Sequence, residues 1–329
     1  MKIYIPFFIL LFSFFLSFLF QKFKLLSSNT GDQHQNFITK LNVPLCGGLI
    51  IFLSFVFIFK ENLTISLFFF LFSVLLLGLF SDIKSISSAQ IRLIFQFIIT
   101  IVFFFMSDLR LSETGIEIID KWNNFYLFNY LFVSLCLIIL INGSNFIDGL
   151  NGLCLGYYLL VTYFIFKNTF FSTIFSDNIN LIIFILSLSI ILFYNFLSKV
   201  FIGDNGSYIL AGLFGIGLIE IYNKNNMISS FYIVLLLWYP CFELLFSMIR
   251  KYIFKKSPME PDNDHLHHLL FYFFVKNFKT QKIFANNSTS LILLTFNFIL
   301  FTVGTIDIYN SKKQCILISI SIILYIVSY

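Results

Sequence analysis

The amino-acid sequence predicts an all-α, polytopic transmembrane bundle that forms one integral membrane domain over residues 1–329. Hydrophobic residues make up 59% of the chain and charged residues only 11%, whereas soluble domains average about 45–50% and about 25%. Apolar runs of about 20 residues, the length a membrane-spanning helix needs, recur along the chain. A soluble fold could not cover its surface with so few charges.

Eleven apolar runs are predicted to span the membrane. The first has no small-residue cleavage site after it, so we expect a retained helix and not a signal peptide. The second and third are separated only by residues 60–62 and could count as one, which would leave ten spans. The predicted spans are 3–21, 43–60, 63–80, 90–107, 126–142, 150–166, 179–197, 206–222, 228–249, 289–306 and 314–329.

Loop charges predict the orientation of these spans. Alternate loops share a side, and thirteen of the 21 Lys and Arg residues fall on one side. The positive-inside rule places that side in the cytoplasm, with the N-terminus outside and the C-terminus cytoplasmic. All four histidines and a long predicted loop over residues 250–288 lie there too. Transporters place ionisable groups near the bilayer midplane, so polar clusters at one face indicate an enzyme that works at the membrane surface.

Residues 142–153 form the most informative polar cluster. Asn142, Asn145 and Asp148 are three apart, which would place them on one face at the end of a helix. Asn151 follows between two glycines, which permit a close backbone approach. The structural alternative is a helix end that is capped by Asn and Asp and followed by a glycine turn.

Two shorter clusters carry an aspartate each. Gly203 and Asp204 precede a span, where a carboxylate and a helix N-terminus could face phosphate and Mg²⁺. Asp82 lies in the polar turn 81–84, before Arg92 and Gln96. The alternatives are an N-capped turn for the first cluster and an ordinary polar turn for the second.

The predicted loop 250–288 contains Asp262, His265, His267 and His268. We interpret them as a polar wall that donates hydrogen bonds to phosphate or sugar oxygens. A zinc site and a solvated loop are the alternatives, although no cysteine accompanies the histidines.

Composition also bears on other partners. The net charge is only +5, and we expect no basic run with interleaved aromatic residues in a water-facing segment, so nucleic acid is not an expected partner. The five cysteines lie in or beside apolar runs, and no two have C-x-x-C spacing, which predicts reduced thiols.

Taken in order, five motif blocks resemble the polyprenyl-phosphate N-acetylhexosamine-1-phosphate transferase family. They are P-x-x-G-G at 44–48, G-x-x-x-D at 78–82, N-x-x-N-x-x-D-G-x-x-G-L at 142–153, G-D-x-G-S at 203–207 and D-x-x-H-x-H-H at 262–268. The family includes the phospho-muramoyl-pentapeptide transferases and the enzymes that initiate O-antigen, teichoic acid and capsule lipids. The segments 240–250 and 257–262 are similar to the surface-polysaccharide branch.

The resemblance implies a reaction in the bacterial inner membrane. A UDP-N-acetylhexosamine and a polyprenyl phosphate in the lipid bilayer would give a polyprenyl-pyrophosphoryl sugar and UMP, with Mg²⁺ or alternatively Mn²⁺. Asp204 would be the main metal ligand and Asp82 a second. Asn142, Asn145, Asp148, Asn151, Gly203 and Asp262 would bind substrate, and His265, His267 and His268 would contact pyrophosphate or sugar. The oligomeric state is left open, with a homodimer as one alternative.

The sequence departs from the family pattern at three positions. Ser81 replaces the first of two adjacent aspartates, Asn151 replaces a frequent second aspartate, and Asn263 replaces a frequent basic residue. Because of Ser81, a catalytically silent scaffold stays open as an alternative. A transporter or flippase of lipid-linked or anionic solutes is the other alternative, although no inverted repeat between the two halves supports it.

Overall fold

The computed structural model describes residues 4–23, 26, 43–167, 178–225, 227–257, 264–279 and 281–329. These residues form thirteen helices and no strand. The helices are α1 (Ile5–Lys22), α2 (Gly47–Phe59), α3 (Ile65–Asp82), α4 (Ala89–Ser107), α5 (Glu117–Asn123), α6 (Tyr126–Ile147), α7 (Leu153–Lys167), α9 (Asn178–Phe196), α10 (Gly203–Lys224), α11 (Ser230–Ile253), α12 (Leu266–Phe278), α13 (Lys282–Thr305) and α14 (Ser311–Ser328).

Each of the eleven predicted spans coincides with a helix, so the all-α prediction is confirmed. Eight helices are long and apolar enough to cross a membrane, namely α3, α4, α6, α9, α10, α11, α13 and α14. The other three predicted spans correspond to shorter apolar stretches in α1, α2 and α7. The chain is a multi-pass membrane protein.

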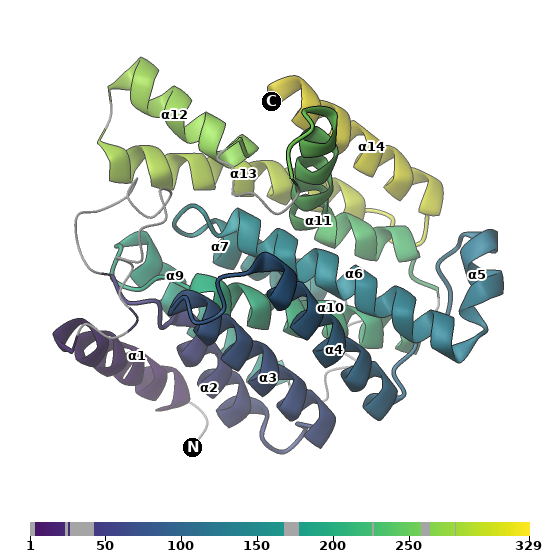
Figure 1. The fold of residues 1–329 in the computed structure, drawn as a ribbon, viewed down its shortest axis with the longest axis horizontal. Coiled ribbons are helices and arrows are strands. Elements are labelled where there is room, and N and C mark those ends of the chain that lie inside the picture. The colour runs from purple at the N-terminus through teal and green to yellow at the C-terminus, as the bar shows by residue number, and fades with distance from the viewer. Residues whose placement is uncertain are drawn as a thin grey trace.

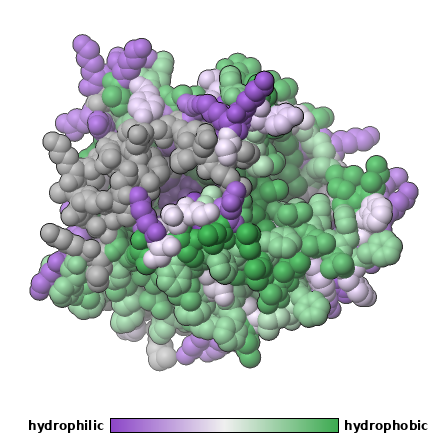
Figure 2. Space-filling model, in the orientation of Figure 1, coloured by the Kyte–Doolittle hydropathy of each residue, from purple (hydrophilic) through white to green (hydrophobic). Residues whose placement is uncertain are grey.

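Helix α10 is the centre of the bundle. It packs against α2, α3, α6 and α7, and 83% of its apolar window is buried, compared with 22% for α4 and 17% for α14. The outer helices therefore present large apolar side chains outward, as helices facing lipid must. Figure 1 shows the helices stacked side by side around this centre, and Figure 2 shows apolar side chains spread widely over the visible face with hydrophilic ones in patches.

Two glycines let α2 and α3 approach the start of α10 closely. A Cβ at Gly48 or at Gly78 would overlap the backbone of Asn205. Only residues without a side chain fit this spacing between helix backbones. The P-x-x-G-G and G-x-x-x-D blocks thus supply the contact that fixes the N-terminus of α10.

Within the predicted loop over residues 250–288, the structure has helical segments that were not predicted. Leu266–Phe278 is a helix, and α13 begins at Lys282, seven residues before the predicted start of its span. The polar first turns of α13 stay helical because α12 and α7 pack against this helix, and Asn286 is fully buried there. The amphipathic helix α5 was also not predicted.

Candidate functional site

The candidate site is centred on Asp204, in the first turn of α10. Its Oδ1 accepts a hydrogen bond from Asn145 Nδ2 at 3.0 Å, and its Oδ2 accepts one from Ser81 Oγ at 2.5 Å. Arg92 Nη1 lies 3.1 Å from the same Oδ2 and forms an ion pair with it. Side chains from α3, α4 and α6 therefore converge on one carboxylate at the N-terminus of the central helix.

Asp82 holds that N-terminus in place. Its Oδ1 accepts from the backbone N–H of Asp204 at 2.9 Å, and its Oδ2 accepts from the backbone N–H and the side-chain amide of Asn205, at 3.1 and 2.5 Å. The first N–H groups of a helix have no partner within the helix, and negative charge is favourable there. Asp82 thus lies in the predicted site, and both of its oxygens serve to position the turn that carries Asp204.

Ser81 and Arg92 form a unit that the sequence did not reveal. Arg92 Nη1 donates a hydrogen bond to Ser81 Oγ at 2.5 Å, and Ser81 Oγ in turn donates one to Asp204 Oδ2. Gln96, one turn further along α4, accepts from Asn142 Nδ2 at 2.6 Å. The i, i+4 spacing of Arg92 and Gln96 on an otherwise apolar helix is the signal that could have found them.

The end of α6 confirms the helical face predicted for residues 142–148. Asn142 and Asn145 lie in the last turns of α6, and Asp148 is its C-cap. The Gly203 backbone donates a hydrogen bond to Asp148, so this carboxylate also faces the start of α10. Removal from water, together with the nearby charges of Asp204 and Asp82, raises the pKa of Asp148 well above its usual range.

The three histidines form one buried cluster beside these carboxylates. The ring centroids of His267 and His268 are 4.3 Å apart, and that of His265 lies 5.5 Å from His267. A Cβ at Gly149 would lie only 2.7 Å from His268 Nε2 and 2.8 Å from His267 Nε2. Because Gly149 follows Asp148 directly, the histidine motif reaches the carboxylate cluster through this glycine.

Two predicted site residues are not part of this cluster as described. Asn151 is buried, its side-chain amide donates to Ser198 Oγ at 2.8 Å, and its backbone N–H donates to Asn286 Oδ1 at 2.9 Å. It ties the turn after α6 to the segment before α10 and to α13. Asp262 lies outside the described residues.

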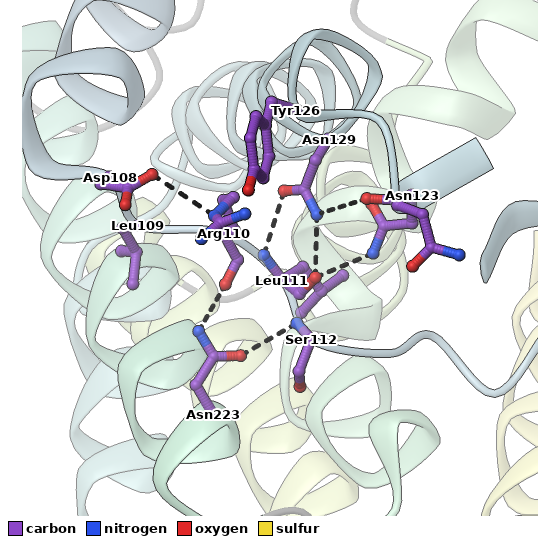
Figure 3. A pocket seen from close by; sticks show the side chains of 10 residues that line it. Asp108, Leu109, Arg110, Leu111, Ser112, Asn123, Tyr126, Asn129 and Asn223 are labelled. Carbon is purple, nitrogen blue, oxygen red and sulfur yellow. Dashed lines mark hydrogen bonds and ion pairs between the residues drawn. The ribbon is translucent and has the colours of Figure 1, made fainter. Parts of the chain in front are cut away.

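A polar pocket lies at the opposite end of the bundle, where α4 ends, α6 begins and α10 ends. Its volume is about 500 Å³, and Figure 3 shows its lining side chains. Three asparagines form hydrogen bonds with the backbone of residues 110–112, namely Asn123, Asn129 and Asn223. They therefore stabilise the turn after α4. None of the predicted site residues lines this pocket, and we place the site at the carboxylates.

The carboxylate cluster fits an Mg²⁺ ion that is also coordinated by substrate and water. It does not form a closed set of protein ligands around the ion. Within the described part of the chain, no three His, Cys, Asp or Glu side chains are arranged to enclose a metal ion. Magnesium, however, is usually held by one or two carboxylates together with waters and substrate phosphates. Asp82, Asp148 and Asp204 lie close together here with Arg92, and burial, followed by the charges of Asp204 and Asp82, raises the pKa of Asp148. Asp204 and Asp148 could hold such a cation.

Comparison with known proteins finds one family model and several relatives that this chain resembles. The model of glycosyl transferase family 4 matches residues 64–222. An "undecaprenyl-phosphate alpha-N-acetylglucosaminyl 1-phosphate transferase" of Thermotoga maritima is 28% identical over 260 residues, which cover 78% of this chain and 74% of the relative. A "probable undecaprenyl-phosphate N-acetylglucosaminyl 1-phosphate transferase" of Bacillus subtilis is 27% identical over 245 residues, or 70% and 66% of the two chains.

A relative with a different name is also similar. A "phospho-N-acetylmuramoyl-pentapeptide-transferase" of Dictyoglomus thermophilum is 32% identical over 205 residues, which cover 58% of this chain and 63% of the relative. The region matched by the family model contains Asp82, Asn145, Asp148 and Asp204. The relationship predicted from the motif blocks is therefore confirmed.

Proposed function

We propose that this chain, a relative of the glycosyl transferase family 4 enzymes, transfers an N-acetylhexosamine-1-phosphate from a UDP-sugar to polyprenyl phosphate. UMP would be released, and the product would start a cell-surface glycan. The observation that carries the proposal is the convergence of Asp204, Asp148, Arg92 and the histidine cluster at one end of a membrane bundle. Water-soluble donor and lipid acceptor can meet only at such a surface.

The reaction joins an oxygen of the acceptor phosphate to the β-phosphorus of the donor and breaks the bond to the UMP oxygen. The second pKa of a phosphate monoester is about 6, so near pH 7 the nucleophile needs little deprotonation. The main obstacle is the approach of two anions, and phosphoryl transfer is largely positioning and electrostatic stabilisation.

The residues divide this task by their position. Arg92 supplies positive charge beside Asp204, and we assign it to the incoming phosphate. Asn142, Asn145 and Asp148, at the end of α6, would bind the nucleotide sugar together with Gly203. His267 and His268, against Gly149, would donate hydrogen bonds to pyrophosphate or sugar oxygens. Asp82 keeps the N-terminus of α10 oriented towards the substrates.

A divalent cation would be held by Asp204 together with Asp148, and we propose Mg²⁺, with Mn²⁺ as the alternative. When bound, it supplies Lewis-acid neutralisation of phosphate charge and a template for in-line displacement. We further propose that the carboxylate end of the bundle faces the cytoplasm of a bacterial inner membrane. The Lys and Arg bias of the loops supports this orientation.

The test is UMP release by purified protein given polyprenyl phosphate and UDP-N-acetylhexosamines. Asp204→Asn keeps size and removes charge, and we expect it to lower turnover by at least about 10²-fold, equivalent to several kcal/mol of lost charge stabilisation. Asp108→Asn is the matched control, because Asp108 lies at the opposite end with a side chain 70% exposed. Near-normal turnover by Asp204→Asn in magnesium would refute the assignment of this carboxylate. No UMP release by the wild type with any UDP-sugar would refute the proposed function.

A further inference from the structure

A buried acid lies behind the histidine cluster, in the middle of an apolar helix. Glu243 of α11 is only 1% exposed, although α11 is one of the helices long and apolar enough to span the membrane. Burial of a carboxylate is costly unless the charge is paired and hydrogen-bonded. Ionisable residues within membrane helices are therefore rare and usually functional. The function proposed above leaves Glu243 without a role.

One hydrogen-bond partner of Glu243 is the first histidine of the motif. Glu243 Oε1 lies 2.9 Å from His265 Nδ1, and His265 is itself buried. An ionised carboxylate can only accept hydrogen bonds, so with Glu243 ionised the proton of this contact would belong to Nδ1. The two ring nitrogens of histidine are distinct, and the partner of one sets the state and direction of the other. Nε2 is thereby left on the side of the ring turned away from Glu243.

The ring of His265 is further confined by its neighbours. Phe146, between Asn145 and Ile147 at the end of α6, packs on it with ring centroids 4.8 Å apart. His265 also forms the N-cap position of α12, directly before the helix that carries His267 and His268. One ring thus contacts α11, the end of α6 and the start of α12. A carboxylate that orients this ring also orients the polar wall of the candidate site.

We propose that Glu243 is a positioning residue for the transfer reaction, which holds His265 with Nδ1 protonated and the ring fixed at the polar wall of the candidate site. This inference rests on the proposed function and adds a residue outside all five motif blocks. The competing interpretation is a purely structural bond that joins α11 to α12. The two differ in whether loss of Glu243 matters once His265 has been removed.

The test is a double-mutant cycle on UMP release with Glu243→Gln, His265→Ala and the double variant. Glutamine keeps the shape and the acceptor oxygen but removes the charge. We expect Glu243→Gln to lower kcat by about 10–100-fold, the loss typical of partners that orient a functional histidine, with KM changed less than about threefold. In the His265→Ala background it should cost less than about twofold more, because residues that act through one another are not additive.

Controls and a second readout keep the outcomes separable. Ser247→Ala removes another buried polar group one turn along α11 and should retain wild-type kcat. Glu243→Asp serves as the second variant if Glu243→Gln does not fold. It keeps the charge, but its side chain is one methylene shorter and so moves the carboxylate away from His265. Histidine ¹⁵N NMR, assigned with His265→Ala, should show the proton on Nδ1 of His265 in the wild type, whether or not UMP is formed.

Three results would overturn the positioning role. The first is a kcat of Glu243→Gln within twofold of the wild-type kcat. The second is the same fold-loss of kcat when Glu243→Gln is added to His265→Ala, and the third is an NMR spectrum in which Nδ1 of His265 carries no proton. An inactive wild type would refute the proposed function instead, and the NMR result would still decide the contact.

Discussion

Replacement of Ser81 by Asp would test the electrostatics of the site directly. Ser81 Oγ lies 2.5 Å from Asp204 Oδ2, so the new carboxylate would face an existing one within about 4 Å. At an effective dielectric constant of about 20, two unit charges at that distance repel by about 4 kcal/mol. Arg92, 3.1 Å from the same oxygen, and the 21% exposure of the Asp204 side chain offset part of this repulsion. We expect a net loss of about 1–3 kcal/mol in stability without divalent cations.

The matched control is Ser81→Asn, which has the same shape as the aspartate variant and no charge. The difference between the two variants therefore isolates the repulsion. Thermal unfolding of the detergent-solubilised proteins should rank Ser81→Asp below Ser81→Asn in chelator. Saturating Mg²⁺ should close at least half of that gap, because the additional carboxylate of Ser81→Asp should bind the cation more tightly, and a tenfold lower Kd adds about 1.4 kcal/mol to the stability of this variant alone. In saturating Mg²⁺, the turnover of Ser81→Asp should stay within about tenfold of wild type.

Equal stability of the two variants in chelator would show that Ser81 does not face an ionised Asp204. A gap that magnesium leaves unchanged would argue against a cation held by Asp204. An inert wild type activated by Ser81→Asp would favour the scaffold alternative.

Three further predictions use other contacts of the site. Arg92→Gln should lower kcat/KM for UMP release by about 10–100-fold, since it removes the positive charge beside Asp204, whereas equal kcat/KM would exclude Arg92 from phosphate binding. Gly149→Ala should displace His267 and His268 and lower turnover at least tenfold, while Gly217→Ala, whose Cβ would meet nothing within 4 Å, should leave turnover unchanged and gain about 0.5–1 kcal/mol in helix stability. An impermeant thiol reagent applied to intact cells should label the opposite end and not the carboxylate end, and the reverse pattern would invert the proposed orientation. The four single cysteines replace exposed residues: Glu113 and Asn310 at the opposite end, and Lys84 and Lys255 at the carboxylate end.

The fold was predictable because apolar run length alone identifies membrane helices. The gathering of Asp82, Asp148 and Asp204 also followed from their positions at helix ends on one predicted side. Helix α12 was not predicted, because its 13 residues are too few for a span and its amphipathic pattern is weak beside the histidine motif.

Other parts of the site depend on partners that sequence does not place. Arg92 looks like the ordinary start of a helix until Ser81 and Asp204 come within 3.1 Å of it. The capping of α10 by Asp82 joins residues 122 and 123 positions apart, and no local pattern encodes such a pairing. Glu243 is a single acid within an apolar helix, and its sequence neighbours do not reveal that His265 lies against it.

The capping of α10 by Asp82 also has a consequence for biogenesis. The chain enters the membrane while it is being made, and α3 is complete 122 residues before its partner Asp204 is synthesised. At a synthesis rate of about 5–20 residues per second, roughly 6–24 s pass between the synthesis of Asp82 and that of the N–H groups that its carboxylate binds. A charge in mid-membrane would be costly throughout that interval, but Asp82 is the last residue of α3, where water can hydrate it. Its place at the helix end lets the bilayer accept α3 long before the site can assemble.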